Sequence, residues 1–174
     1  MRKIFFLTFL SAATLFSCKN QEKKEEQTPE ENNFVVTVNM NVLQDDNFQI
    51  YYMETPGAPL DANKFVSVSV KGKTTPQDVI FKLPQDVLLA DLRFDLGDNK
   101  KQKEIKINSF KFDYLTKSFL VKDSLVDFYF GYNEQVALDK KTGTAKIKEI
   151  AGQPHDPLLV AKSTLNEELA KLIK

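Results

Sequence analysis

The sequence predicts an all-β domain, an antiparallel β-sandwich of jelly-roll type, followed by a C-terminal α-helix. Short segments of alternating apolar and polar residues recur along the chain, with turn residues roughly every 8 to 12 positions. Phenylalanine is abundant and glycine is scarce, with 14 and 6 residues respectively, which is typical of a folded β-rich domain. Near the end of the chain the apolar spacing becomes helical. An immunoglobulin-like sandwich is the alternative.

Eight or nine short strands are expected, because these segments alternate or are rich in aromatic and β-branched residues. The ten segments from which these strands are expected are, in order, Phe34–Val42, Phe48–Met53, Phe65–Val70, Asp78–Leu83, Leu92–Leu96, the adjoining Ile105–Asn108 and Phe110–Tyr114, Phe128–Phe130, and a hairpin of Gln135–Leu138 with Ala145–Ile150. The apolar phase changes around Asn108 and Ser109, which predicts a β-bulge or a bend there.

The C-terminal helix is expected to begin at about Pro157, with Asp156 as its N-cap. Its apolar stripe is spaced at helical intervals and consists of Leu158, Leu159, Ala161, Leu165, Leu169 and Leu172. Because such a stripe is costly to leave in water, we expect it to pack on the sandwich. Docking on a partner or on a membrane surface is the alternative.

The N-terminus has the composition of a secretory signal. Arg2 and Lys3 precede the apolar residues 4–16, a run of 13 that is too short to cross a bilayer as a helix. Cys18 follows this run and is the only cysteine in the chain. If its thiol is used for an anchor, no disulfide, thiolate metal site or cysteine nucleophile remains.

These residues resemble a bacterial lipoprotein signal, in which the cysteine becomes the lipid-modified first residue of the mature chain; Phe16 is bulkier than the usual occupant of its position. The resemblance implies a signal peptide over residues 1–17 and attachment to a membrane through a lipid on Cys18. Residues 18–33 are expected to form a polar tether, and residues 34–174 are expected to form the sandwich domain with its helix. The charged residues just after Cys18 are similar to the export signals of Bacteroidota-type lipoproteins, which implies the outer membrane.

The composition and the motifs argue against several classes of function. Without residues 1–17 the chain has 22 basic and 24 acidic residues, so a basic face for nucleic acid is not expected. His155 is the only histidine, and no serine lies in a nucleophile-elbow context. We therefore predict a protein that is not an enzyme and has no cofactor or metal site. Residues 45–47 and 95–99 are interpreted as turns, with a structural calcium ion as the alternative.

Four side chains are candidate ligand contacts. Arg93 and Asp95 are two apart on an expected strand and share its outer face, while Leu92, Phe94 and Leu96 point to the core. Adjacent Tyr51 and Tyr52 must point to opposite faces of their strand, so one of them faces solvent. Exposed aromatic rings stack on sugars in carbohydrate modules. Tyr51, Tyr52, Arg93 and Asp95 are therefore the candidate site.

The passage from Phe48 to Tyr114, with its Leu83-Pro84 strand end and the turn after Asp95, resembles galactose-binding-like jelly-roll domains. The pattern of the whole chain is similar to uncharacterised envelope lipoproteins. These resemblances imply a non-catalytic envelope lipoprotein that binds a glycan or another extracellular ligand. The alternative is a structural or accessory lipoprotein that binds a protein partner in an envelope assembly.

Overall fold

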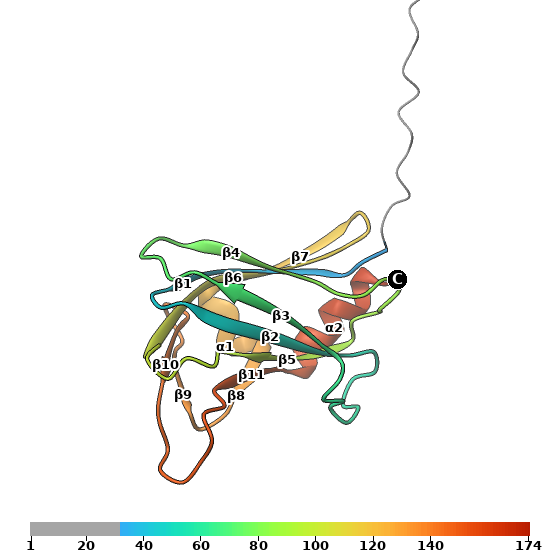
Figure 1. Ribbon diagram of the computed structural model, residues 1–174. Helices are drawn as coiled ribbons and strands as arrows, with labels where there is room; N and C mark the ends of the chain where they lie inside the picture. Colours follow the sequence, from blue (N-terminus) through green and yellow to red (C-terminus); the bar gives the residue numbers. More distant parts are fainter. Residues whose placement is uncertain (1–31) are drawn as a thin grey trace, which may run out of the picture.

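The computed structural model describes residues 32–174. Two antiparallel sheets pack face to face, and a C-terminal helix lies at one end of them (Figure 1). The prediction of an antiparallel β-sandwich with a C-terminal helix is confirmed. The expected signal peptide over 1–17, Cys18 and nearly all of the expected tether lie outside the described residues.

One sheet has six strands, in the order β4-β1-β6-β10-β9, with β7 also paired to β6. Its strands are β1 Val35–Val42, β4 Gln77–Lys82, β6 Glu104–Tyr114, β7 Lys117–Lys122, β9 Val136–Asp139 and β10 Thr144–Ile147. The second sheet has five strands, in the order β3-β2-β5-β11-β8. These are β2 Asp46–Met53, β3 Phe65–Val70, β5 Asp91–Asp95, β8 Phe130–Tyr132 and β11 Leu158–Ala161.

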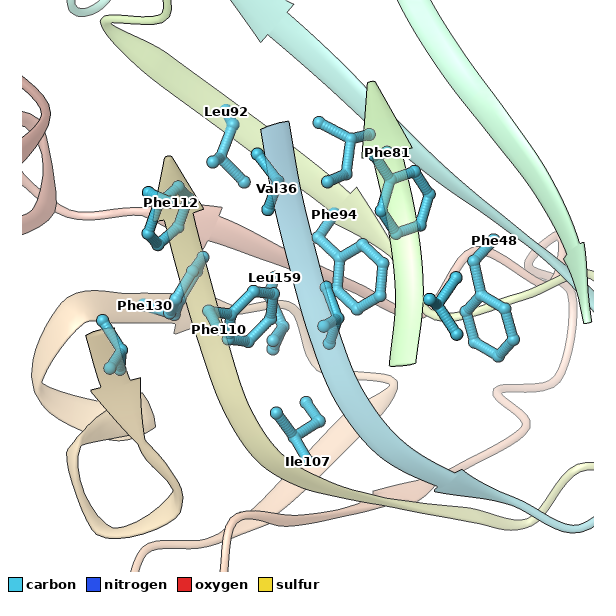
Figure 2. Packing of buried hydrophobic residues seen from close by; sticks show 14 of the residues in the cluster. Val36, Phe48, Phe81, Leu92, Phe94, Ile107, Phe110, Phe112, Phe130 and Leu159 are labelled. Carbon is cyan, nitrogen blue, oxygen red and sulfur yellow. The ribbon is translucent and has the colours of Figure 1, made fainter. Parts of the chain in front are cut away.

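The core lies between the sheets and is built largely from phenylalanine. Phe94 of β5 meets Phe110 of β6 with ring centroids 5.4 Å apart and the rings perpendicular, and Phe110 packs on Phe130 of β8 at 4.5 Å. Figure 2 shows these rings pointing toward one another from strands of both sheets. Strict alternation in β1 and β2 places every second side chain in this core, as the sequence pattern predicts.

A β-bulge in β6 explains the change of apolar phase. Asn39 of β1 pairs with Ser109, but the next residue, Met40, pairs with Ile107, so Asn108 is the extra residue. Its side-chain amide donates to Oδ1 of Asn39 at 3.0 Å and of Asn41 at 3.1 Å. The two expected segments are therefore one continuous strand, and the predicted bulge is confirmed.

The predicted start of the C-terminal helix at Pro157 is wrong. Leu158–Ala161 is strand β11, which lies between β5 and β8, and the helix α2 covers Ser163–Leu172. Backbone pairing with two neighbouring strands outweighs the helical spacing of these four residues. Asp156 is not the N-cap; Lys162 is, without a side-chain capping bond.

The rest of the apolar stripe behaves as predicted. Leu165, Leu169 and Leu172 of α2 are buried in the core, so the helix is part of the sandwich. None of the helices within residues 32–174 is both long and apolar enough to cross a bilayer.

A second correction concerns the chain before β8. Phe128 and Tyr129, expected in a strand, belong to the short helix α1 Val126–Tyr129, which follows a 3-10 turn over Asp123–Leu125. Val126 is buried while Phe128 points outward, so one turn of helix divides these apolar residues between core and surface. Strand β7 was not predicted from the sequence.

Candidate functional site

The outer face of the five-stranded sheet carries three of the four predicted ligand residues. Tyr51 of β2 is paired in register with Arg93 of β5 on one side and with Phe65 of β3 on the other. The guanidinium carbon of Arg93 lies 5.5 Å from the centre of the Tyr51 ring, and the Phe65 ring lies 5.3 Å from it. Tyr51 is therefore held between a cation and a second ring, and Phe65 is the more exposed aromatic.

Tyr52 lies on the opposite face of β2. Only 8% of its surface is exposed, and it belongs to the hydrophobic core. The inference that the two tyrosines point to opposite faces is confirmed. Because the Tyr52 ring packs inside the sandwich, it cannot stack on a sugar.

Arg93 and Asp95 form an ion pair that also holds the loop before β11. Arg93 Nε donates to Asp95 Oδ1 at 2.5 Å and its Nη2 donates to Oδ2 at 3.0 Å. Nη2 also donates to a carboxylate oxygen of Asp156. The cluster therefore joins β5 to the loop that precedes β11, a structural role that the sequence did not reveal.

The electrostatics of this cluster depend on burial. Burial raises the pKa of Asp95 above its usual range, and the hydrogen bond and charge of Arg93 oppose this only in part. Burial also works against charge on Arg93, but Asp95 and Asp156 outweigh it and raise the pKa of the guanidinium. Arg93 therefore stays charged beside a carboxylate that is costly to ionise.

A cavity of about 440 Å³ lies at the end of the sandwich where β1 turns into β2. The β1–β2 turn and the β5–β6 loop, about fifty residues apart, meet here. The lining consists of Asp45, Asp46, Asn47, Ser69, Val70, Lys71, Asp98 and Asn99. This volume is within the usual range for small-ligand sites. We call it the end cavity.

Asp46 forms the floor of the end cavity and is 8% exposed. Its Oδ1 accepts hydrogen bonds from the backbone N–H groups of Asn47, Asp98 and Asn99 at 2.8, 2.8 and 2.9 Å. This is turn chemistry of the kind predicted from the sequence. Within residues 32–174, no three His, Cys, Asp or Glu side chains are grouped so as to hold a metal ion, and we propose no calcium site here.

The rim of the end cavity is a network of side-chain hydrogen bonds. Asn47 Oδ1 accepts from the hydroxyls of Ser67 and Ser69 at 2.9 and 3.3 Å, and Asn47 Nδ2 donates to Asp98 Oδ2 at 3.3 Å. Lys71 hydrogen-bonds Asp45 at 2.6 Å and lowers the pKa of that carboxyl. The rim thus presents oriented amide, hydroxyl and carboxylate groups.

The end cavity and the outer face are continuous along β2. Tyr51, Gln49 and Asn47 alternate onto the same face, and the Tyr51 hydroxyl donates to Gln49 Oε1 at 3.2 Å. Asn47 is also part of the cavity lining. The five residues of extended strand from Asn47 to Tyr51 span about 13 Å. We call this row, with Phe65, Ser67 and Ser69 of β3, the polar row.

Sequence reasoning missed Phe65, Gln49, Asn47 and Asp156 as members of this region. The alternation in β2 and β3 could have shown that the odd-numbered residues of both strands face outward. The pairing of β2 with β3 and β5, which brings them together, is a long-range property that no local pattern carries.

His155 lies in a separate, smaller cavity of about 80 Å³ with Gln135 and Glu149. Both of its ring nitrogens are buried and without a hydrogen-bond partner. Gln135 holds this loop by donating to the Pro154 carbonyl at 2.7 Å and accepting from the Asp156 N–H at 2.9 Å. The histidine is thus enclosed in an ordered loop away from the polar row.

No protein-family model, no curated protein and no solved structure matches this chain.

Proposed function

We propose that this protein is a non-catalytic lipoprotein of the cell envelope that binds a glycan or a similar polyhydroxylated ligand. The lipid would be carried by Cys18, and the outer membrane is the proposed location, as the signal-like residues 1–17 and the charged residues after Cys18 suggest. The sandwich domain would then act outside the cytoplasm.

The observation that carries the ligand proposal is the polar row, which joins the exposed Phe65 ring to the end cavity. Sugars present both apolar ring faces and hydroxyls, so they need an aromatic surface together with oriented polar groups. Phe65 and Tyr51 provide the first, while Asn47, Gln49 and Ser69 provide the second. About 13 Å of strand accommodates a short oligosaccharide.

The charges around the end cavity favour a neutral ligand. Asp45, Asp46 and Asp98 line it together with a single cation, Lys71, which is already paired with Asp45. Like charges brought together across an interface are costly, so a uronic acid or phosphorylated sugar would be disfavoured.

A binding assay with the full-length lipoprotein in detergent tests the proposal. We would compare β-1,4-linked mannohexaose with the mannuronate hexamer of the same linkage, within a wider glycan array. Binding to neutral glycans that is lost in Asn47→Ala and Phe65→Ala supports the proposal. Ile80→Ala is the matched control, because Ile80 is 56% exposed on the outer face of the other sheet. Absence of binding to every glycan would refute it.

An exposed apolar patch beside α1 favours the second candidate function, binding of a protein partner. Phe128 is 57% exposed with its ring standing edge-on against Tyr129, and Leu125 and Tyr132 are exposed nearby in the chain. Such a patch on a monomer marks an interaction surface. A stoichiometric partner that is cross-linked in intact envelopes and lost in Phe128→Ser, but kept in Phe65→Ala, would favour this second function.

A further inference from the structure

The start of the described chain and three of the connections between strands lie at the same end of the sandwich. β1 begins at Val35, which pairs with Lys82 at the end of β4 and with Asp113 near the end of β6. The loop 83–90 and the turn 115–116 therefore lie at this end. The Leu83 N–H donates to the Phe34 carbonyl at 2.9 Å, which fixes that loop beside the chain start.

The loop 54–64 between β2 and β3 lies at the same end. Met53, the last residue of β2, pairs with Asp91, the first residue of β5, and accepts a hydrogen bond from the Ala90 N–H at 2.9 Å. Figure 1 shows this loop, the C-terminus and the start of the described chain together at one end of the sandwich. We call it the N-terminal end.

Each of these three connections exposes a leucine. Leu60, Leu88 and Leu115 are exposed by 43%, 41% and 52% respectively. These three leucines come from three separate connections at the same end, and none of them belongs to the core. We call them the apolar rim. The exposure of any one of these leucines is ordinary, and it is their shared position at one end that we use below.

Leu115 carries an additional cost. It occupies the two-residue turn between β6 and β7 with φ of 51°, a left-handed conformation in which asparagine and glycine are favoured and bulky residues are strained. The chain therefore places a leucine where both its backbone and its side chain are unfavourable. Strained backbone of this kind clusters at functional positions.

We propose that the N-terminal end rests on the lipid bilayer, with Leu60, Leu88 and Leu115 inserted among the upper acyl segments. This inference rests on the proposed anchor at Cys18. Cys18 is fourteen residues before Asn32, so the lipid lies within about 50 Å of this end. The opposite end, with the end cavity, is a further eight residues of β1 away, about 26 Å. The cavity then faces away from the membrane.

The test uses the lipidated full-length protein in vesicles of phosphatidylethanolamine and phosphatidylglycerol. Because Cys18 is the only cysteine in the chain and the lipid uses its thiol, an introduced cysteine can be labelled alone with an environment-sensitive fluorophore. The variants are Leu60→Cys, Leu88→Cys and Leu115→Cys. Leu43→Cys is the matched control, since Leu43 is 49% exposed in the β1–β2 turn at the opposite end.

The fluorophores at the three leucines should lose most of their emission when lipids carrying a nitroxide on the acyl chain are included, while the fluorophore at Leu43 keeps its emission. Equal quenching at all four positions, or none in vesicle-bound protein, overturns the inference. Fluorophores that are shielded in native envelopes but not in lipid vesicles indicate a protein partner instead. Protein that is neither vesicle-bound nor labelled by fatty acid refutes the anchor itself, which is a distinct result.

The variant Leu115→Asn gives a second measurement. Asparagine tolerates the left-handed turn, so the melting temperature of the protein should rise. At the same time, quenching at a fluorophore on Leu88→Cys should decrease, because part of the apolar rim is lost. A rise in melting temperature with unchanged quenching would show that Leu115 does not contact lipid.

Discussion

Asp46 and Gly97 are in direct contact: both carboxylate oxygens of Asp46 lie within 2.6 Å of the point where a Cβ on Gly97 would stand. Gly97 also has φ of 95°, a conformation that costs other residues strain. Asp46 cannot move aside easily, because its Oδ1 is held by three backbone N–H groups. The pair therefore fastens the β1–β2 turn to the β5–β6 loop and shapes the floor of the end cavity.

We expect Gly97→Ala to lower the free energy of unfolding by about 2–4 kcal/mol, through backbone strain together with displacement of Asp46. Gly152→Ala is the matched control, because Gly152 has φ of 80° but no atom lies within 4 Å of the point where its Cβ would stand. In this control the free energy of unfolding should fall by only about 1 kcal/mol. Urea unfolding of both variants measures the difference, and equal losses would show that the contact with Asp46 contributes nothing.

The sequence predicts the two turns that Asp46 and Gly97 join, but not that these turns meet. The two Asp- and Asn-rich segments, 45–47 and 95–99, are recognisable as turns because their side chains bond the local backbone. That they meet depends on β2 pairing with β5, which is set by packing between strands far apart in the chain. Local pattern therefore identified the two turns, but neither their meeting in the end cavity nor the part of its lining that comes from Ser69, Val70 and Lys71.

A further prediction concerns the ion pair between Arg93 and Asp95. Arg93→Met leaves the Asp95 carboxylate half-buried without its counter-ion. We therefore expect this substitution to lower the free energy of unfolding by about 1–3 kcal/mol at pH 7. Asp95→Asn removes the charge that burial penalises and leaves Arg93 with Asp156. Asp95→Asn should therefore lower the free energy of unfolding by only about 1 kcal/mol or less.

The pH dependence of the free energy of unfolding distinguishes the loss of the Asp95 counter-ion from a simple loss of packing around Arg93. The pKa of Asp95 is raised in the folded protein, so the folded state binds the proton more tightly than the unfolded state. This contribution to stability is present below the unfolded pKa of 3.8 and is lost as pH rises through the higher folded value. In Arg93→Met the lowering effect of Arg93 on this carboxyl is absent, so the folded pKa of Asp95 rises further. The destabilisation of Arg93→Met relative to wild type should therefore shrink as pH falls from about 7 toward about 4. A pH-independent difference in unfolding midpoints would contradict this.

Lipidation is predicted at Cys18. Cys18→Ser should block attachment of the lipid and leave the precursor unprocessed or poorly retained in membranes, because no other cysteine can replace it. Metabolic labelling with a fatty-acid analogue measures this directly. Lys19→Ser is a suitable control, since it changes the neighbouring residue and should keep the label. Equal labelling of Cys18→Ser and wild type would refute lipidation at this position.

The end of the chain shows why sequence periodicity predicted the wrong boundary. Leu158, Leu159 and Ala161 continue the helical spacing of Leu165 and Leu169, but a short apolar run fits a buried strand equally well. The strand forms because the edge of β5 is open to Leu158, Leu159 and Val160 in antiparallel register, with β8 completing the sheet on the other side. Only the presence of these two partners decides between the two structures.

The last prediction concerns the helix α2 as part of the core. Leu169 is fully buried, so Leu169→Ala should lower the free energy of unfolding by about 2–4 kcal/mol, from lost apolar burial and the cavity left behind. Lys171→Ala on the exposed side of the same helix should change the free energy of unfolding by less than about 0.5 kcal/mol, although Lys171 pairs with Glu168.

Truncation after Gln153 removes β11 as well as α2, so it should abolish cooperative unfolding rather than merely lower the melting temperature. If the truncated protein still melts cooperatively at the wild-type temperature, β11 and α2 contribute little to the fold, and the apolar stripe must serve another contact.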